Sequence, residues 1–215
     1  MTRQQRARVR PISPSALVEE LADRITATRP GHWLRVAVDG APAAAPDALA
    51  AGLVDPLRVR GRPAQLVPAA GFLRPASVRL ELGRQDPDSY YQRWLDEPGL
   101  RREVLDPLGP GGTGRVLPSL WDPVTDRATR AGYLSVPPGG VVLVSGALLL
   151  GGALPFDLTV HLALSPAALS RRTSPEQRWT LPAFDRYRRE VAPEQVAGIV
   201  IRTDDPDHPA IVDRR

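Results

Sequence analysis

The sequence predicts one three-layer α/β domain with a mostly parallel sheet flanked by helices. Short apolar runs, such as residues 34–38 and 141–144, alternate with segments of helical periodicity. These runs lack the alternation of polar and apolar residues that marks half-exposed strands, as is typical of parallel strands buried on both faces. The length of 215 residues fits one domain of this kind.

The elements are expected in the following order. Ser13 and Pro14 are a typical helix start, and apolar side chains follow every four residues as far as Ile25, so the first helix should close near residues 30–31. Strands are expected at 34–38, 64–67, 141–144, 158–164 and 198–201, and helices at 48–54, 90–97, 100–105 and 182–191 and from Ser165-Pro166 onward. The domain should span 13–212, with a basic tail at 1–12 and a short tail at 213–215.

The basic residues limit the chemistry that the chain can perform. All 28 Lys+Arg residues are arginine, so a mechanism that needs a lysine is excluded. Arginine cannot replace lysine as a compact point charge on a flexible stem. The formal net charge is +4, and the arginines are spread along the chain rather than gathered in one stripe, which disfavours a nucleic-acid partner.

Other classes of protein are disfavoured by residues that are missing. The chain has no cysteine and only three scattered histidines, which excludes a disulfide framework and gives no metal-ligand spacing. The longest apolar run, 141–150, is interrupted and shorter than the roughly 18 residues of a membrane span. Residues 1–10 are basic but lead into Pro-Ile-Ser-Pro rather than an apolar signal core. We therefore expect a cytoplasmic protein with neither a metal site nor a membrane partner.

A glycine after the first strand raises the question of a phosphate-binding loop. Such a loop joins a strand to a helix, and its signature is G-x-x-x-x-G-K-[ST]. Placed on Gly40, the signature requires Gly, Lys and Ser or Thr at the positions that Ala45, Pro46 and Asp47 occupy. Taken alone, this match is weak.

Further segments occur in the order and spacing of a known family. Residues 36–40 read Val-Ala-Val-Asp-Gly, 71–75 read Gly-Phe-Leu-Arg-Pro, and 105–112 read Leu-Asp-Pro-Leu-Gly-Pro-Gly-Gly. Val-Leu-Val-Ser-Gly at 142–146, the Arg171-Arg172 pair and Tyr-Arg-Arg at 187–189 follow. In these segments the chain resembles bacterial uridine kinase and related nucleoside kinases of the P-loop class. The resemblance implies a P-loop NTPase-like fold and ATP-dependent phosphoryl transfer to a nucleoside.

The departures from the family fall on its chemistry. In the family the loop lysine contacts the β- and γ-phosphates and the next hydroxyl holds Mg²⁺, whereas Pro46 has no charge and Asp47 adds a negative one. The family's acidic pair, one member of which would accept the substrate hydroxyl proton, falls on Ala70 and Gly71, and Ser145 replaces an acid of the later strand. The sequence therefore predicts a degenerate Walker A loop and no catalytic residue. The residues of this loop that carry the prediction are Gly40, Ala45, Pro46 and Asp47.

Six residues remain as candidates for ligand binding, each with a structural alternative. Arg74 could contact a nucleoside or an acidic ligand, or form a surface salt bridge. The aromatic residues that include Tyr91 and Trp94 could stack on a base, or belong to the core. Asp39 could hold a ligand or stabilise the end of its strand, and the two lid arginines could touch phosphates or be solvated. The candidates are Asp39, Arg74, Tyr91, Trp94, Arg171 and Arg172.

The function expected from these observations is non-catalytic. A degenerate member of the family would bind a nucleoside-like small molecule or a protein partner, and no cofactor is expected. The alternative is an active ATP-dependent uridine or cytidine kinase with an atypical phosphate loop, which would use ATP and Mg²⁺. A third class, a structural or oligomer-forming protein, would bind no small molecule.

Overall fold

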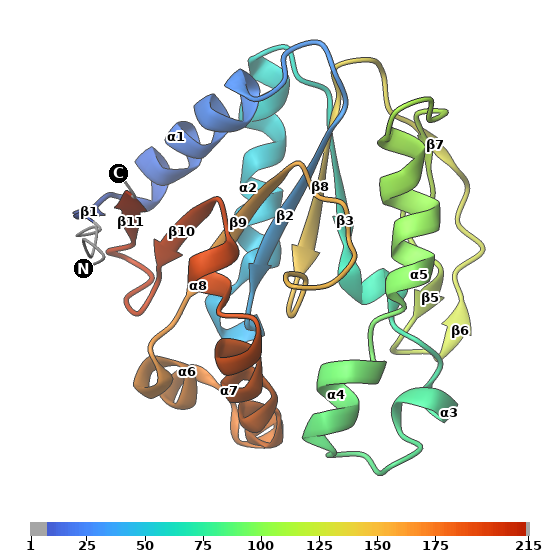
Figure 1. Cartoon of the computed structure of the whole chain (residues 1–215), viewed down its shortest axis with the longest axis vertical. Coiled ribbons are helices and arrows are strands. Elements are labelled where there is room, and N and C mark those ends of the chain that lie inside the picture. Colours follow the sequence, from blue (N-terminus) through green and yellow to red (C-terminus); the bar gives the residue numbers. More distant parts are fainter. Residues whose placement is uncertain (1–7, 214–215) are drawn as a thin grey trace, which may run out of the picture.

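The computed structural model describes residues 8–213, and a seven-stranded sheet runs through this part of the chain (Figure 1). The strand order is β1-β11-β10-β9-β2-β8-β3. The five strands from β10 to β3 are parallel, and β11 and β1 complete one edge in antiparallel pairing. The sheet strands are β1 (Arg8–Pro11), β2 (Leu34–Gly40), β3 (Ala64–Pro68), β8 (Val141–Gly146), β9 (Leu158–Ala163), β10 (Ile199–Arg202) and β11 (Ala210–Asp213).

Helices lie along the sheet and beyond the ends of its parallel strands (Figure 1). They are α1 (Pro14–Ala27), α2 (Pro46–Val59), α3 (Ala76–Arg79), α4 (Pro87–Arg93), α5 (Glu97–Leu100), α6 (Pro166–Arg172), α7 (Leu181–Glu190) and α8 (Pro193–Val196). A π-helical turn (Arg101–Leu105) continues α5, and two short ribbons pair β4 (Arg115–Val116) with β7 (Leu134–Ser135) and β5 (Trp121–Asp122) with β6 (Arg127–Ala128). Within residues 8–213 no helix has the length and apolar character needed to cross a membrane.

The central strands are buried on both faces, which produces the three layers. Val36 and Val38 of β2 pack in one cluster with the apolar sides of α1 and α2. Ala37, between them, faces the opposite layer and shares a cluster with Tyr187 of α7. Val142 of β8 likewise packs with the side chains around α5. Successive side chains of a strand point to opposite faces, so an uninterrupted apolar run is required here, as the sequence indicated.

The predicted fold class and central elements are confirmed, with corrections to some boundaries. Ser13 caps α1 by accepting from the Ala16 N–H at 3.3 Å, although the helix ends at Ala27 rather than near residue 30. The helices expected at 90–97 and 100–105 are displaced, because α4 ends at Arg93 and Asp96 caps α5, in whose first turn the missing N–H of Pro98 is tolerated. Residues 8–11, expected in the basic tail, form β1, because they pair with the antiparallel edge strand β11. Asp213, expected in the C-terminal tail, is the last residue of β11. The tail residues 1–7 and 214–215 lie outside the described range.

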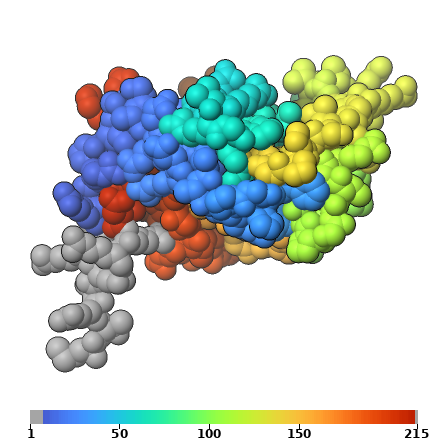
Figure 2. Space-filling view, turned by 90° about the horizontal axis from the view of Figure 1, so that it is seen from above, coloured from blue at the N-terminus to red at the C-terminus, as the bar shows by residue number. Residues whose placement is uncertain are grey.

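A buried arginine joins three segments at the end of the sheet where the parallel strands begin. Arg62 is 6% exposed and donates to the carbonyls of Thr26, Thr28 and His32, at 3.2, 3.2 and 3.1 Å. Figure 2 views the molecule from this end and shows the blue N-terminal segments, the cyan segment and the yellow segment packed together. Desolvation by burial lowers the pKa of Arg62. The three carbonyls accept from the two terminal nitrogens of Arg62, while its buried Nε has no partner within the described residues, and these contacts fix the loop that leads into β2.

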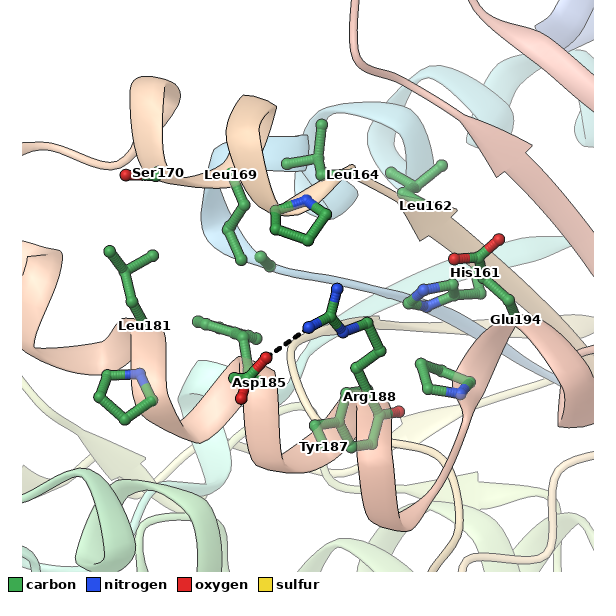
Figure 3. Close-up of a pocket in the computed structure, with 15 residues that line it drawn as sticks. His161, Leu162, Leu164, Leu169, Ser170, Leu181, Asp185, Tyr187, Arg188 and Glu194 are labelled. Carbon is green, nitrogen blue, oxygen red and sulfur yellow. Dashed lines mark hydrogen bonds and ion pairs between the residues drawn. The ribbon is translucent and has the colours of Figure 1, made fainter.

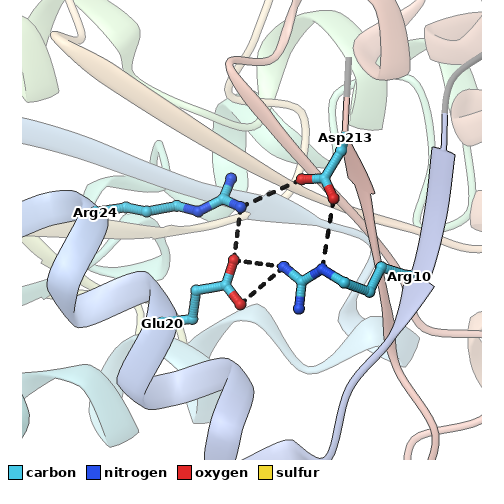
Figure 4. A network of polar contacts seen from close by, with 4 residues as sticks. All are labelled: Arg10, Glu20, Arg24 and Asp213. Atoms are coloured by element: carbon cyan, nitrogen blue, oxygen red, sulfur yellow. Dashed lines mark hydrogen bonds and ion pairs between the residues drawn. The ribbon is translucent and has the colours of Figure 1, made fainter. Parts of the chain in front are cut away.

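Four charged side chains join the two ends of the described chain (Figure 4). Glu20 of α1 accepts from Arg10 of β1 at 2.6 Å and from Arg24 at 2.6 Å. Asp213 of β11 accepts from the same two arginines, at 3.5 and 3.3 Å. The carboxylates alternate with the guanidinium groups, so the ring of contacts ties β1 and β11 to α1.

Replacement of Glu20 by Gln should lower the free energy of unfolding at pH 7 by about 1 kcal/mol or less, because these side chains are partly exposed. Partial burial by itself would raise the pKa of Glu20, but hydrogen bonds from Arg10 and Arg24 outweigh it and lower the pKa. The contribution is therefore present above the unfolded-state pKa of about 4.3 and is lost as the pH falls through the lower folded-state pKa. Urea denaturation should show the difference between Glu20→Gln and wild type shrinking as the pH falls from 7 to 3. A difference that is as large at pH 3 as at pH 7 would contradict an ionic origin.

Candidate functional site

Two cavities open at the edge of the sheet where the parallel strands end. In folds of this type ligands bind beyond the carboxyl ends of the strands. The loop cavity has a volume of about 450 Å³ and lies between residues 40–47, Arg74, α4 and the residues that follow β8. The second, the α6–α7 cavity, has a volume of about 430 Å³ and lies between those two helices and the end of β9. The predicted site residues Gly40, Pro46, Asp47, Ala70 and Ser145 all line the loop cavity, which the sequence could not show.

Residues 40–47 connect β2 to α2 through a tight turn. The Ala44 N–H donates to the Ala41 carbonyl at 2.7 Å, and the Ala45 N–H donates to the Pro42 carbonyl at 3.0 Å. Pro42 and Pro46 have no N–H group. Positions 42, 44, 45 and 46 therefore offer no free amide to an anion.

Ala45 adopts a left-handed backbone conformation, with φ of 56° and ψ of 52°. The phosphate-loop signature has a glycine at this position, and left-handed geometry favours glycine because it has no Cβ. The left-handed turn is therefore present, but alanine occupies the position that favours glycine.

Replacement of Ala45 by Gly should stabilise the protein by about 0.5 kcal/mol. Relief of the left-handed strain exceeds the extra entropy that glycine gives to the unfolded chain. Thermal and urea denaturation can measure this change. Ala48→Gly, within α2, is the matched control and should be destabilising by up to about 1 kcal/mol. A loss of stability in Ala45→Gly would mean that the left-handed turn carries no strain.

Asp47 and Ser145 are in direct contact. The Ser145 hydroxyl donates to Oδ1 of Asp47, linking the first turn of α2 to the end of β8. Ser145 is fully buried, whereas Asp47 is exposed at the cavity surface. In the family that the sequence resembles, the hydroxyl belongs at position 47 and the acid at position 145. The pair is therefore present with its two residue types exchanged.

Asp39 lies in a buried network and faces away from the loop cavity. It is fully buried and accepts from the Leu149 N–H at 2.9 Å, from the Tyr187 hydroxyl at 3.0 Å and from Nδ1 of His161 at 2.7 Å. Burial, followed by the charge of Asp39, raises the pKa of Tyr187. These contacts engage both carboxylate oxygens of Asp39 inside the protein, at the end of β2.

His161 and Tyr187 were not singled out as site residues from the sequence. Asp39 and His161 are partners in the register of the neighbouring strands β2 and β9, and Tyr187 comes from α7. The signal available in the sequence was a polar residue in each of two apolar strands. The strand order, which is needed to pair these two residues, cannot be read from the sequence.

Arg74 lies beside α4 at the wall of the loop cavity. Its backbone N–H donates to the Trp94 carbonyl at 2.8 Å, which fixes the residue beside α4. No hydrogen bond or ion pair of its guanidinium group occurs within residues 8–213, and Arg74 lines the loop cavity. It therefore presents an unneutralised positive charge at the cavity.

The aromatic residues of α4 both line the cavity and pack against α7. Tyr90 meets Trp94 at a ring distance of 5.0 Å and meets Trp179 and Phe184 at 5.5 and 5.9 Å. Burial raises the pKa of Tyr90 to about 12. Tyr91 carries the Arg186 guanidinium over its ring at 4.6 Å. Tyr90 and Trp94 thus form part of a satellite core, and Tyr91 and Trp94 keep surface at the cavity.

The two arginines expected in the lid, Arg171 and Arg172, do not line the loop cavity. Arg172 of α6 donates to the Thr203 carbonyl, while Arg171 beside it is exposed.

The two positions of the expected acidic pair differ in the space around them. Ala70 lines the cavity and is exposed, but Gly71 is closed off, because a Cβ there would lie 2.7 Å from the Cβ of Ser119. A carboxylate could be accommodated at position 70 and not at position 71.

Comparison with known proteins places the architecture. No protein-family model matches the sequence, and no curated protein sequence matches it. Among solved structures, a possible uridine kinase from Bacillus stearothermophilus is similar with a TM-score of 0.70 and 18% identity, covering 86% of this chain and 97% of that one. The chain shares the fold of this structure.

Two further solved structures have a similar fold. A candidate fructose transport system kinase from Silicibacter sp. TM1040 has a TM-score of 0.54 and 24% identity, over 82% of this chain and 89% of that one. The YGR205w protein has a TM-score of 0.56 and 10% identity, over 92% and 98%. Residues 40–47 join a central parallel strand to the helix that follows it, the kind of connection at which phosphate-binding loops occur.

Proposed function

We propose that this protein is a non-catalytic member of the P-loop kinase fold that binds a nucleoside-like small molecule in the loop cavity. The observation that carries the proposal is the loop at 40–47, which has no cationic side chain for a triphosphate and adds a carboxylate at position 47. Asp47 would repel the phosphates, and the two prolines remove amide donors. A hydrogen bond to a charged group contributes roughly 1.5–3 kcal/mol, and several such bonds would be missing together.

The chemistry of the loop cavity supports a small polar ligand with an aromatic part. Tyr91 and Trp94 offer ring surface, Arg74 offers an unneutralised guanidinium group, and Asp47 offers an acceptor for hydroxyl groups. The volume of about 450 Å³ lies within the range of small-molecule sites. A nucleoside carries a flat base, which can stack on these rings and accept from Arg74 through its polar edge. Its ribose hydroxyls can donate to Asp47. The kinase named among the similar structures as a possible uridine kinase agrees with this class of ligand.

The alternative function, an active nucleoside kinase, makes the opposite prediction for ATP. Calorimetry with ATP and Mg²⁺ should detect no binding to the purified protein, and incubation with ATP, Mg²⁺ and uridine or cytidine should give no turnover above a control without protein. Turnover clearly above that control would overturn the proposal in favour of the kinase.

A thermal-shift screen of nucleosides tests the binding itself. A nucleoside at 100 times its dissociation constant should add about 2.7 kcal/mol of stability. Arg74→Ala should weaken the binding, and Arg127→Ala, at an exposed arginine outside the cavity, is the matched control. The absence of any shift across nucleosides, nucleotides and sugars would favour a protein-binding or structural role instead.

A further inference from the structure

The α6–α7 cavity, whose lining residues Figure 3 draws, shares none of them with the loop cavity. Its wall is mainly apolar, and it has a volume of about 430 Å³. Side chains from the end of β9, from α6 and from α7 surround it. The apolar side chains that matter for the argument are Leu162, Leu164, Leu169, Leu181 and Phe184.

One nitrogen of His161 faces this apolar space. The His161 side chain is 9% exposed, and its ring lies beside the cavity in Figure 3. Nδ1 is held by Oδ2 of Asp39 at 2.7 Å, and this carboxylate also accepts from Leu149 and Tyr187. A carboxylate oxygen accepts, so the hydrogen bond between Asp39 and His161 places a proton on Nδ1. In the neutral imidazole Nε2 is then an acceptor, and no group within residues 8–213 donates to it.

The charged groups at the cavity disfavour an anionic ligand. Arg188 is paired with Asp185 at 2.5 Å, as the dashed line in Figure 3 shows. Glu194 adds a further carboxylate, without a salt bridge to any residue of the described chain. The charges around the cavity are therefore one guanidinium group and two carboxylates. An anionic head group would meet net repulsion, while a neutral ligand would not.

We propose that the α6–α7 cavity binds a small, neutral, mainly apolar molecule with a hydroxyl group, and that this hydroxyl donates to Nε2 of His161. The leucines and Phe184 receive the apolar body of the ligand, since burial of apolar surface drives its entry. Asp39 fixes the orientation and the tautomer of the His161 ring, as a carboxylate bonded to one ring nitrogen commonly does for a functional histidine. The site is independent of the proposed nucleoside site.

Two probe molecules that differ in one hydrogen-bond donor test this proposal on the unaltered protein. 4-Propylphenol carries a hydroxyl, and 4-propylanisole replaces it by a methyl ether of similar shape. We expect 4-propylphenol to bind roughly tenfold more tightly, because the ether leaves Nε2 without a donor. It should also shift the Nε2 resonance of His161 in a long-range ¹H–¹⁵N spectrum. The other two histidines, His32 and His208, are exposed and should not shift, and His32→Gln and His208→Gln assign the signals.

Two variants complete the experiment. Leu169→Trp fills the cavity while leaving His161 in place, and it should abolish the binding of both probes. Leu82→Trp, at a surface leucine 57% exposed, is the matched control and should bind them as wild type does. His161→Phe should bind the two probes equally. Equal affinities in the wild type, no shift of the His161 signal, or binding that survives Leu169→Trp would each overturn the proposal.

Discussion

Replacement of Asp157 by Asn should lower the free energy of unfolding by about 3 kcal/mol. Nε and Nη2 of Arg35 donate to the two carboxylate oxygens of Asp157 at 2.9 and 3.0 Å, and the Arg35 backbone N–H donates at 3.0 Å. Arg29 contacts the same carboxylate. The side chains of Asp157 and Arg35 are only 7% and 12% exposed. Removal of the negative charge would leave the Arg35 guanidinium buried without its counterion.

The pH dependence separates the charge of Asp157 from its shape. Burial alone would raise the pKa of Asp157, but the hydrogen bonds from Arg35 outweigh it and lower the pKa. The carboxylate therefore stabilises the fold above its unfolded-state pKa of about 3.9, and this contribution is lost as the pH falls through the folded-state value. Urea denaturation at pH 7 and pH 3 should show the deficit of Asp157→Asn shrinking in acid.

A double replacement is the control for Asp157. Arg35→Met with Asp157→Leu removes both charges together and should lose less stability than Asp157→Asn, since it leaves no unpaired buried charge. If Asp157→Asn cost less than about 1 kcal/mol at pH 7, the pair would behave as an exposed salt bridge despite its burial.

Restoration of the phosphate loop should produce the largest change in ligand binding. The variant combines Ala45→Gly, Pro46→Lys, Asp47→Ser and Ser145→Asp, which returns the hydroxyl and the acid to the positions that the family resemblance implies. We expect affinity for ATP with Mg²⁺ to rise at least about 100-fold, because a repulsive carboxylate leaves the loop and at least one charge-assisted hydrogen bond is gained. Calorimetry against wild type measures the gain.

The control for the restored loop differs from it at one position. The same variant with Pro46→Gln in place of Pro46→Lys has the amide donor without the positive charge, and it should bind ATP distinctly less well. Neither variant should phosphorylate uridine or cytidine, because position 70 still lacks a carboxylate that could accept the hydroxyl proton. Full turnover by the restored loop would show that the proton acceptor lies elsewhere.

Much of the fold follows from local patterns in the sequence. Ser13, Ser165 and Pro166 mark helix starts, and the apolar runs of β2 and β8 identify parallel strands buried on both faces. The loop at 40–47 was also located, since a glycine after a strand and before a helix is a local signal. The edge strand β1 was missed, because its four residues have no strand pattern of their own and depend on pairing with β11.

The sequence by itself determined the three-layer fold, the absence of lysine and the carboxylate at position 47 of the loop. Only the tertiary structure decided which polar residues meet: Ser145 with Asp47, 98 positions apart, and His161 with Asp39, 122 positions apart. It also decided that Arg74 has no carboxylate partner in the described chain. The physical reason is that periodicity and capping depend on neighbours along the chain, whereas these contacts depend on strand order and on how α2 and α7 pack against the sheet.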